Sequence, residues 1–368
     1  MTHDDLILIF TRGLGPRTIH DLVAEFGSAE AVIGASRREL MERGGLREDI
    51  AQCIVRREAQ SAAEQEVEYC RKHGIIMLAA TDPEYPETLK QCIDRPHVLF
   101  VQGNVEALSM DKPLAMVGTR EMTPSGATIC NRLVTGLGKR LKGLCIVSGL
   151  AYGVDAACHR SALANNIPTV AVLASVLPEI TPAPHRAIAK DILKSGGAIV
   201  SELHSQTRQN GSFFIARNRI IAGLTQGTLV VESPASGGSL ATADIADSYH
   251  RVVMAVPGRL TDVASFGCNN LIRTGKARLV LTPDDIISDL GWTGDDQSVE
   301  DESAEDDLES LTPNERAIYD IIASKEVVLF DEIINRSQLA ISDAVMSVTN
   351  LELKGLVRSM PGQRYEKI

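Results

Sequence analysis

Glycines, hydroxyl residues and an arginine follow short apolar runs in this sequence. Gly118, Thr119 and Arg120 come directly after the run LAMV, and Ser148 and Gly149 come directly after the run LCIV. A glycine lets the backbone approach a ligand closely, amides at the start of a following helix face an anion, and a guanidinium offers paired donors to phosphate. The residue types and their positions therefore predict a phosphate-binding site.

Two further segments carry the same chemistry. Arg217 and Asn218 lie in the stretch FFIARNRIIAGL, which we expect to be a helix with these two residues near its start. Arg219, next in the chain, is either a further ligand or a surface charge. Gly238 and Ser239 open another expected helix after the run TLVVES, where exposed amides and hydroxyls suit an anion. We expect these segments to extend the predicted phosphate site.

Aromatic residues make up only 4% of the chain, so stacking of nucleic-acid bases would have to rest on a few rings. Phe213 and Phe214 precede Arg217, and Tyr152 and Phe266 lie in two other loops. A base stacked on an aromatic ring contributes about 1–3 kcal/mol. These rings are candidates for stacking, and each could equally belong to the core.

Two acidic residues leave a catalytic alternative open. Glu202 and Glu232 end apolar runs and could act as general bases in a nucleotide-processing enzyme, such as a phosphoribohydrolase. The segment GGSLAT (237–242) resembles only loosely the P-G-G-x-G-T-x-x-E motif of such enzymes. No G-x-G-x-x-G motif signals a nicotinamide cofactor, and no two cysteines are arranged as C-x-x-C. We therefore expect a binding protein without catalytic residues, cofactor or metal.

Seven apolar, β-branched runs must position these residues, and a helical stretch follows each of them. Because the runs are continuously apolar, both faces of their sheet must be covered, which indicates a doubly wound, mainly parallel sheet of the α/β class. Ligands bind such sheets beyond the carboxyl ends of the strands, where the candidate residues lie. The runs are LAMVG (114–118), LCIVSG (144–149), TVAVLA (169–174), AIVSE (198–202), TLVVES (228–233), RVVMAVPG (251–258) and ARLVL (277–281).

The charge of the chain is distributed unevenly. Its 368 residues have a formal net charge of −11, which would ordinarily argue against a nucleic-acid binder. Residues 114–291, however, hold 17 basic and 12 acidic residues, whereas residues 293–310 hold nine acidic residues and no basic one. With so little apolar content, the acidic stretch is predicted to be a linker, or else an acidic tail that mimics nucleic acid. The segment with the candidate loops is thus positively charged.

The motifs of the central segment resemble those of the DprA (Smf) family of DNA-processing proteins. Their order and spacing match over essentially the whole central domain, and the lead-in ATDPEYPETLKQCIDRPHVLFVQGN is similar as well. The matching motifs are VGTR, VSGLAYGVDAACHRSAL, AVLAS, VSE, FFIARNRIIAGL, LVVES, GGSLATADIA, VPG and FGCNNLIRTGKA.

This resemblance implies an extended Rossmann-like domain that binds single-stranded DNA without sequence preference. It also implies a homodimer formed through that domain, and a role in loading RecA onto incoming strands during natural transformation. The family usually has a Tyr-Pro and an Asn after its third strand; here only Pro182 matches, and His185 and Arg186 could substitute. Carried over to this sequence, the phosphate site comprises Gly118, Thr119, Arg120, Arg217 and Asn218, with Ser148, Gly149, Gly238 and Ser239 at its rim.

Composition and resemblance together divide the chain into four parts. The last part has few basic residues on its expected third helix, from Ser342 to Lys354, which favours protein contact or weak DNA contact over specific DNA binding. The parts are a helical SAM-like or helix-hairpin-helix domain (1–75), the Rossmann-like domain (76–292) with its lead-in (76–113), the acidic linker (293–310) and a winged-helix domain (311–368).

The chain shows no sign of a membrane segment or a secretory signal. Its apolar stretches fall far short of the roughly 20 residues that span a bilayer, and its first residues lack a basic region and a cleavage site. Its seven scattered cysteines are typical of thiols in a reducing compartment. We therefore expect a cytoplasmic protein that does not contact membranes.

Overall fold

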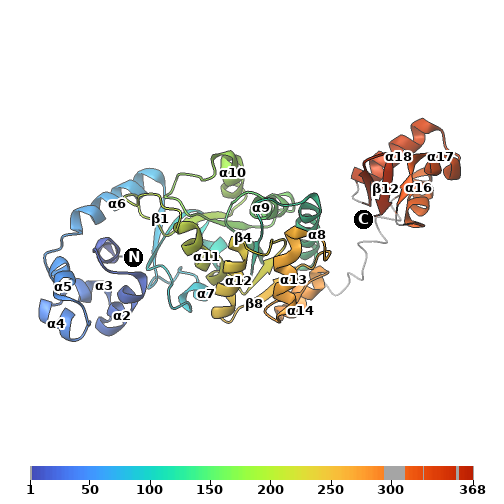
Figure 1. Ribbon diagram of the computed structural model, residues 1–368. Helices are drawn as coiled ribbons and strands as arrows, with labels where there is room; N and C mark the ends of the chain where they lie inside the picture. Colours follow the sequence, from blue (N-terminus) through green and yellow to red (C-terminus); the bar gives the residue numbers. More distant parts are fainter. Residues whose placement is uncertain (1, 294–310, 326, 354–355, 368) are drawn as a thin grey trace. The chain divides into compact units, whose positions relative to one another are not determined.

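The computed structural model describes residues 2–293, 311–325, 327–353 and 356–367, and it divides the chain into two compact units, residues 1–295 and 296–368 (Figure 1). All but the first residue of the predicted linker lies outside the described residues, so the linker stays a prediction.

The first unit is built on a nine-stranded sheet with the order β1-β2-β6-β5-β4-β3-β7-β8-β9. Strands β3 to β9 are parallel, and β2 runs antiparallel to both β1 and β6. All seven predicted strands are confirmed. The strands are β1 (Ile76–Ala79), β2 (Val98–Gly103), β3 (Lys112–Val117), β4 (Leu144–Ser148), β5 (Thr169–Val172), β6 (Ala198–Ser201), β7 (Gly227–Val230), β8 (Val252–Ala255) and β9 (Arg278–Leu279).

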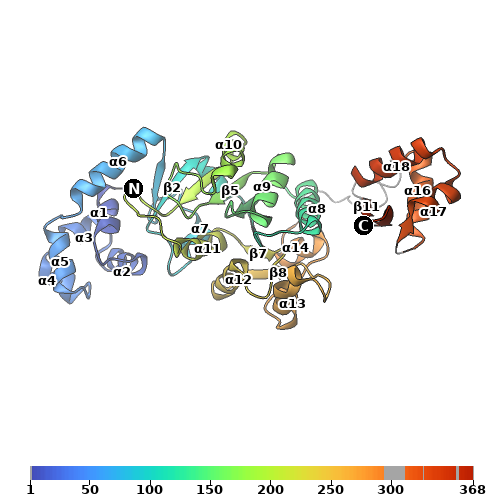
Figure 2. The ribbon, with the colours of Figure 1, turned by 45° about the horizontal axis from the view of Figure 1, so that its top comes forward.

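Helices cover both faces of this sheet (Figures 1 and 2). Successive residues of β3 alternate between two apolar cores: Leu114 and Met116 join the core beneath α8 and α9, while Ala115 and Val117 join the core beneath α11, α12 and α13. This explains why the strand sequences are continuously apolar. The helices are α8 (Pro124–Arg140), α9 (Val154–Ala164), α10 (Arg186–Lys194), α11 (Phe213–Gly223), α12 (Gly238–Ser248), α13 (Phe266–Arg273) and α14 (Pro283–Asp289).

The N-terminal segment is helical, as predicted, and it shares an apolar core with the sheet. Leu6 and Ile54 of the helices belong to the same cluster as Phe100 of β2 and Ile199 of β6. The boundary predicted after residue 75 falls directly before β1. The helices are α1 (His3–Phe10), α2 (Pro16–Phe26), α3 (Ala29–Gly34), α4 (Arg37–Glu42), α5 (Glu48–Val55) and α6 (Gln60–His73), and α7 (Glu87–Lys90) follows β1.

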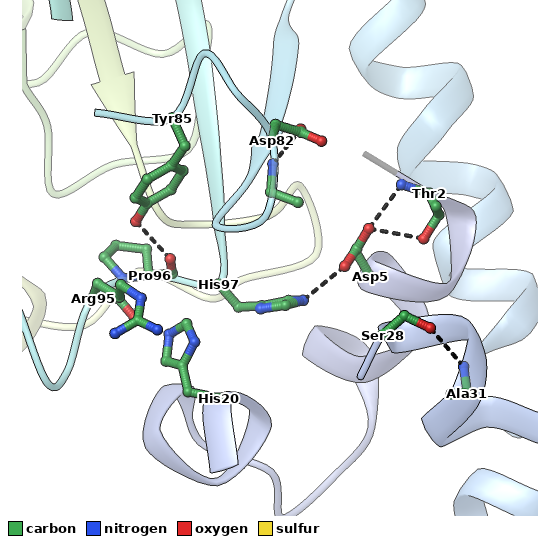
Figure 3. Close-up of polar contacts among 11 residues, drawn as sticks. Thr2, Asp5, His20, Ser28, Ala31, Asp82, Tyr85, Arg95, Pro96 and His97 are labelled. Atoms are coloured by element: carbon green, nitrogen blue, oxygen red, sulfur yellow. Dashed lines mark hydrogen bonds and ion pairs between the residues drawn. The ribbon is translucent and has the colours of Figure 1, made fainter. Parts of the chain in front are cut away.

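Buried polar contacts also join the N-terminal helices to the segment that leads into β2 (Figure 3). Nε2 of His97 lies 2.9 Å from Oδ1 of Asp5 on α1, and both side chains are almost fully buried. Burial alone would raise the pKa of Asp5, but hydrogen bonds from His97 and Thr2 bring it below its ordinary value. Nε2 of His20 on α2 lies 2.9 Å from the carbonyl oxygen of Arg95. These contacts fix α1 and α2 against the sheet.

The second unit is a winged helix. Its three helices and the two strands flanking Pro361 and Gly362 match the predicted pattern, and the short strand β10 completes a sheet with the order β10-β12-β11. Ile318, Ile322 and Ile333 lie in its apolar core. The elements are α16 (Pro313–Ala323), β10 (Val328–Leu329), α17 (Phe330–Ser337), α18 (Ile341–Leu353), β11 (Val357–Met360) and β12 (Arg364–Lys367).

Candidate nucleic-acid interface

The loops after β3, β4 and β7 meet at the carboxyl edge of the sheet. Chain order runs outward from β3, toward β4 on one side and β7 on the other, so this edge is the topological switch point of the fold. The amide of Thr119 donates to the carbonyl of Glu232 (2.8 Å), and the amide of Val154 donates to the carbonyl of Thr119 (3.2 Å). Gly153 has φ +73°, and a Cβ there would collide with the carbonyl of Thr119. A glycine is therefore required where the first two loops touch.

Arg120 is an exposed cation at this edge. Its Cζ lies 5.3 Å from the ring centroid of Phe214, at the start of α11. Such a cation–π contact holds the guanidinium in place while its N–H groups stay open to solvent. Phe213 and Phe214 are both partly exposed. The predicted phosphate donor and a predicted stacking ring therefore lie together, although they are 94 positions apart in the sequence.

Arg217 differs from Arg120 in its surroundings. The prediction that Arg217 lies near the start of a helix is wrong, because Arg217 lies in the middle of α11 and is only 5% exposed. Its Nη1 donates to the carbonyls of Gly149 (2.7 Å) and Val172. Burial lowers its pKa, and the nearby Asp155 raises it in part. Asp155 in turn accepts from the amides of Gly149 and Ala151. Arg217 thus links the ends of β4 and β5 by hydrogen bonds within the protein interior.

The other predicted rim residues are held mainly by contacts within the protein. Ser148 is buried and donates to the carbonyl of Met116 (2.6 Å). Ser239 is buried and bonds the hydroxyl of Ser233 (2.9 Å). Asn218 donates to the carbonyl of Gly238 (3.3 Å). Of the nine predicted residues, Arg120 and Gly238 are exposed, Gly118 and Thr119 are half-buried, and the remaining five are buried.

Glu232 has a role that sequence reasoning missed. Its carboxylate accepts hydrogen bonds from the amide (2.9 Å) and the hydroxyl of Thr123, the residue that caps α8. A Cβ at Gly126 would collide with this carboxylate, so a glycine is needed in the first turn of the helix. We expected the start of α8 to face a bound phosphate, but it already faces an anion of the protein itself.

The second candidate base, Glu202, is also engaged. Its side chain forms an ion pair with Arg219 on α11, and both are mostly buried. Burial raises the pKa of Glu202, and Arg219 opposes that effect. Arg219 is therefore paired with an acid rather than free at the surface. Within the described part of the chain, no cluster of three or more His, Cys, Asp or Glu side chains is arranged to hold a metal.

The loop that follows β5 departs from the family pattern but still reaches this edge. Nδ1 of His185 lies 2.8 Å from the carbonyl oxygen of Leu150, and the His185 ring meets that of Tyr152 edge to face at 4.9 Å. Tyr152 is 47% exposed, and Arg186, which begins α10, is exposed. His185 thus supports the loop after β4, while a DNA contact by Arg186 stays a prediction. Phe266, 42% exposed, begins α13.

Taken together, the fold and this edge define a doubly wound α/β protein with an exposed arginine and aromatic rings at its switch point, followed by a winged helix. The family model described as DNA recombination-mediator protein A matches residues 76–291, and the DprA winged helix domain matches residues 302–363. The chain belongs to this DprA family.

Curated relatives and solved structures agree with that assignment. Protein Smf of Synechocystis is 29% identical over 97% of this chain and 96% of its own length, and a putative DprA of Mycobacterium tuberculosis is 32% identical over 88% and 85%. The structure of DprA from Streptococcus pneumoniae covers 78% of this chain and 98% of its own, with 28% identity and a TM-score of 0.68. A Helicobacter pylori DprA structure, whose description concerns single-stranded DNA binding, covers 58% and 98%, with 26% identity and a TM-score of 0.51.

Among the described residues, none of the helices combines the length and the apolar character needed to cross a membrane.

Proposed function

We propose that this chain binds single-stranded DNA without sequence preference at the carboxyl edge of its nine-stranded sheet. One observation carries the proposal: the exposed guanidinium of Arg120 lies over the ring of Phe214 at the switch point. A cation for the strand's backbone beside a ring for its bases is the combination on which sequence-independent strand binding depends. The relative from Helicobacter pylori, described by its single-stranded DNA binding mode, supports the same role.

The charges and the hydrogen-bond partners of the surrounding side chains support the proposal of a DNA-binding site at this edge. Residues 114–291 have more basic than acidic residues, although the whole chain is acidic. Two acids that follow strands at this edge, Glu202 and Glu232, are taken up by Arg219 and by the cap of α8, whereas Glu121, next to Arg120 in the chain, is exposed. Partners within the protein thus offset the charges of Glu202 and Glu232, which would otherwise repel a phosphate. For the same reason we propose a binding role without catalysis, since neither carboxylate is left free to act as a general base.

Fluorescence anisotropy with labelled single- and double-stranded oligonucleotides, over a series of salt concentrations, tests this proposal. Arg120→Ala should weaken single-strand binding about tenfold and reduce the slope of log K against log salt by about 0.7, because one phosphate contact is lost. Arg132→Ala is the matched control, since Arg132 is exposed on α8, away from the switch point. Equal affinity of wild type and Arg120→Ala, with equal slopes, would contradict the proposal.

We further propose that the bound strand is passed to the RecA recombinase during natural transformation, in the cytoplasm. The family description as a DNA recombination mediator supports this step. RecA filament formation on strands covered by single-strand binding protein should speed up when the chain is added, and less so with Arg120→Ala. Restored transformation in a competent bacterium that lacks its own homologue is the cellular counterpart of this test.

We also propose that the chain forms a homodimer through its Rossmann-like part. Three apolar residues between β8 and the first turn of α13 are exposed: Leu260 (86%), Val263 (66%) and Phe266 (42%). Exposed apolar side chains close in sequence are a candidate contact surface for a second copy. Analytical ultracentrifugation should show a dimer for the wild type and a weaker one for Val263→Asp; a monomeric wild type would exclude the dimer.

A further inference from the structure

The loop between β6 and α11, residues 202–212, leads directly into the rings of the proposed binding edge. Phe213 and Phe214 follow it, and the amide of Phe213 donates to the carbonyl of Asn210 (3.2 Å). The position of the Phe214 ring over Arg120 therefore depends on where this loop is held. The contacts that hold it come from the N-terminal helices.

Glu66 of α6 is the central contact. Its side chain is 1% exposed and lies 139 positions away from its partner, Ser205. The amide of Ser205 donates to both carboxylate oxygens of Glu66 at 3.0 Å, and the hydroxyl of Ser205 donates to Oε2. A single loop residue thus supplies three hydrogen bonds to one buried carboxylate.

Further contacts surround this one. The ring of His204 packs on that of Phe10 of α1 with centroids 4.2 Å apart, and Gln206 donates to Gln65 of α6 (3.4 Å). The hydroxyl of Tyr69, one turn along α6 from Glu66, donates to the carbonyl of Leu177 in the loop after β5 (2.8 Å). Helix α6 therefore holds two loops on the carboxyl side of the sheet.

Burial makes the contact between Glu66 and Ser205 difficult to break. A carboxylate removed from water is tolerated only where donors compensate for its lost hydration, and leaving it uncompensated costs several kcal/mol. If the loop moved away, Glu66 would lose both donors of Ser205, and with them three hydrogen bonds, at once. The buried carboxylate therefore restricts the loop to one position, unlike the exposed Glu64 one half-turn earlier, which bonds only Gln60.

We propose that Glu66 is a positioning residue for strand binding: by fixing Ser205, it sets the place of Phe214 at the binding edge without contacting DNA itself. This inference rests on the proposed function and gives the N-terminal helices a part in it. Residues 1–75, with 13 acidic and 10 basic residues, would thus contribute to DNA binding without touching the strand.

The position of the loop can be measured without DNA. Arg208, exposed in this loop, is a site for trypsin, and cleavage there requires the loop to leave its place. In the full chain, Glu66→Gln should increase the rate of cleavage after Arg208 several-fold, as followed by mass spectrometry, while the matched Glu64→Gln should not. Ser205→Thr keeps both donors and should cleave like the wild type, whereas Ser205→Ala should cleave faster.

Strand binding is then compared in the same variants. Glu66→Gln should weaken single-strand affinity several-fold and leave the salt dependence unchanged, because no phosphate contact is removed. In a Phe214→Ala background, Glu66→Gln should have almost no further effect, since the ring that it positions is gone. Ser205→Ala repeats the comparison should Glu66→Gln fail to give folded protein by circular dichroism.

The outcomes separate this inference from the proposed function. A wild type that binds no single strand overturns the proposed function, whatever the cleavage rates are. A wild type that binds, with Glu66→Gln and Ser205→Ala binding equally well, overturns the positioning role alone. An equal loss in the wild-type and Phe214→Ala backgrounds also overturns it, because the effect would not pass through the ring.

Discussion

The carboxyl edge of the sheet and the exposed face of α18 belong to two folds that commonly bind nucleic acid, yet they present different chemistry. The edge exposes Arg120 beside Phe214 and pairs Glu202 and Glu232 with partners inside the protein. The exposed side of α18 carries Ile341, Val345 and Met346, which are 66%, 48% and 65% exposed. Between Ile341 and Leu353 the helix has no basic residue.

The difference shows that neither fold name decides what is bound. A winged helix reads DNA when its third helix offers donors to phosphates and base edges, and α18 offers apolar side chains instead. The edge of the sheet offers a cation and a ring, which suit a single strand. The expectation from the sequence, that this unit makes protein contact or weak DNA contact rather than binding specific DNA, stays a prediction.

The largest effect should come from the buried arginine of the edge. Arg217→Met removes the donor to the carbonyls of Gly149 and Val172 and the positive charge near the buried Asp155. A buried acceptor left without its donor costs about 1–3 kcal/mol of unfolding free energy, and two carbonyls lose theirs here. Arg120→Ala, at the surface, should cost about 0.5 kcal/mol or less.

Urea unfolding of both variants, followed by circular dichroism, measures this contrast. Equal stability of Arg217→Met and Arg120→Ala would show that Arg217 does not stabilise the edge. Arg217 would then again be a candidate for direct contact with a DNA strand.

The next effect compares the two regions directly. Phe214→Ala removes the ring beside Arg120 and should weaken single-strand binding by about 1–3 kcal/mol. Met346→Ala, the matched removal of an exposed apolar side chain from α18, should leave the affinity within about twofold. Anisotropy titrations at one salt concentration compare the single-strand affinities of the two variants with that of the wild type. A large loss for Met346→Ala would mean that α18 takes part in strand binding.

Much of this arrangement was predictable, and the exceptions have a common cause. The seven runs of apolar residues predicted seven strands because both faces of a parallel sheet are buried, and the residues after them were placed correctly at one edge. The burial of individual polar side chains could not be predicted from the sequence. Arg217 and Arg120 are the same residue type, but the partners that bury Arg217 lie 45 and 68 positions away in the sequence. Likewise, Glu232 meets Thr123 from 109 positions away.

The dependence of unfolding free energy on pH should differ between the two units. Burial, and next the charge of Arg217, lower the pKa of His159 to about 3, and burial lowers that of His20 to about 4. Since these histidines gain protons more readily when unfolded, their stabilising contribution is complete above pH 6.5 and is lost as the pH falls toward their folded pKa values. Each should cost about 1.4 kcal/mol per pH unit in that range.

The winged helix is the internal control, because no histidine follows His250 in the sequence. The single tryptophan, Trp292, reports on the first unit by fluorescence. Urea midpoints from Trp292 should fall between pH 7 and pH 5, and His159→Gln should reduce the fall. An unchanged midpoint would show that the buried histidines are not neutral in the folded protein.

The smallest effect concerns the nine acidic residues of the segment 293–310. Deleting residues 293–310, or replacing them with a Gly/Ser segment of equal length, removes nine negative charges without touching the sheet edge. If the segment is a passive linker, single-strand affinity should stay the same at 0.1 M salt, where the Debye length is about 10 Å, and rise by up to about twofold at 0.01 M, where it is about 30 Å. The Gly/Ser replacement separates charge from length. Weaker binding in both variants would mean that the acidic segment takes part in binding, because removing negative charge cannot by itself weaken the attraction between the edge and a phosphate backbone.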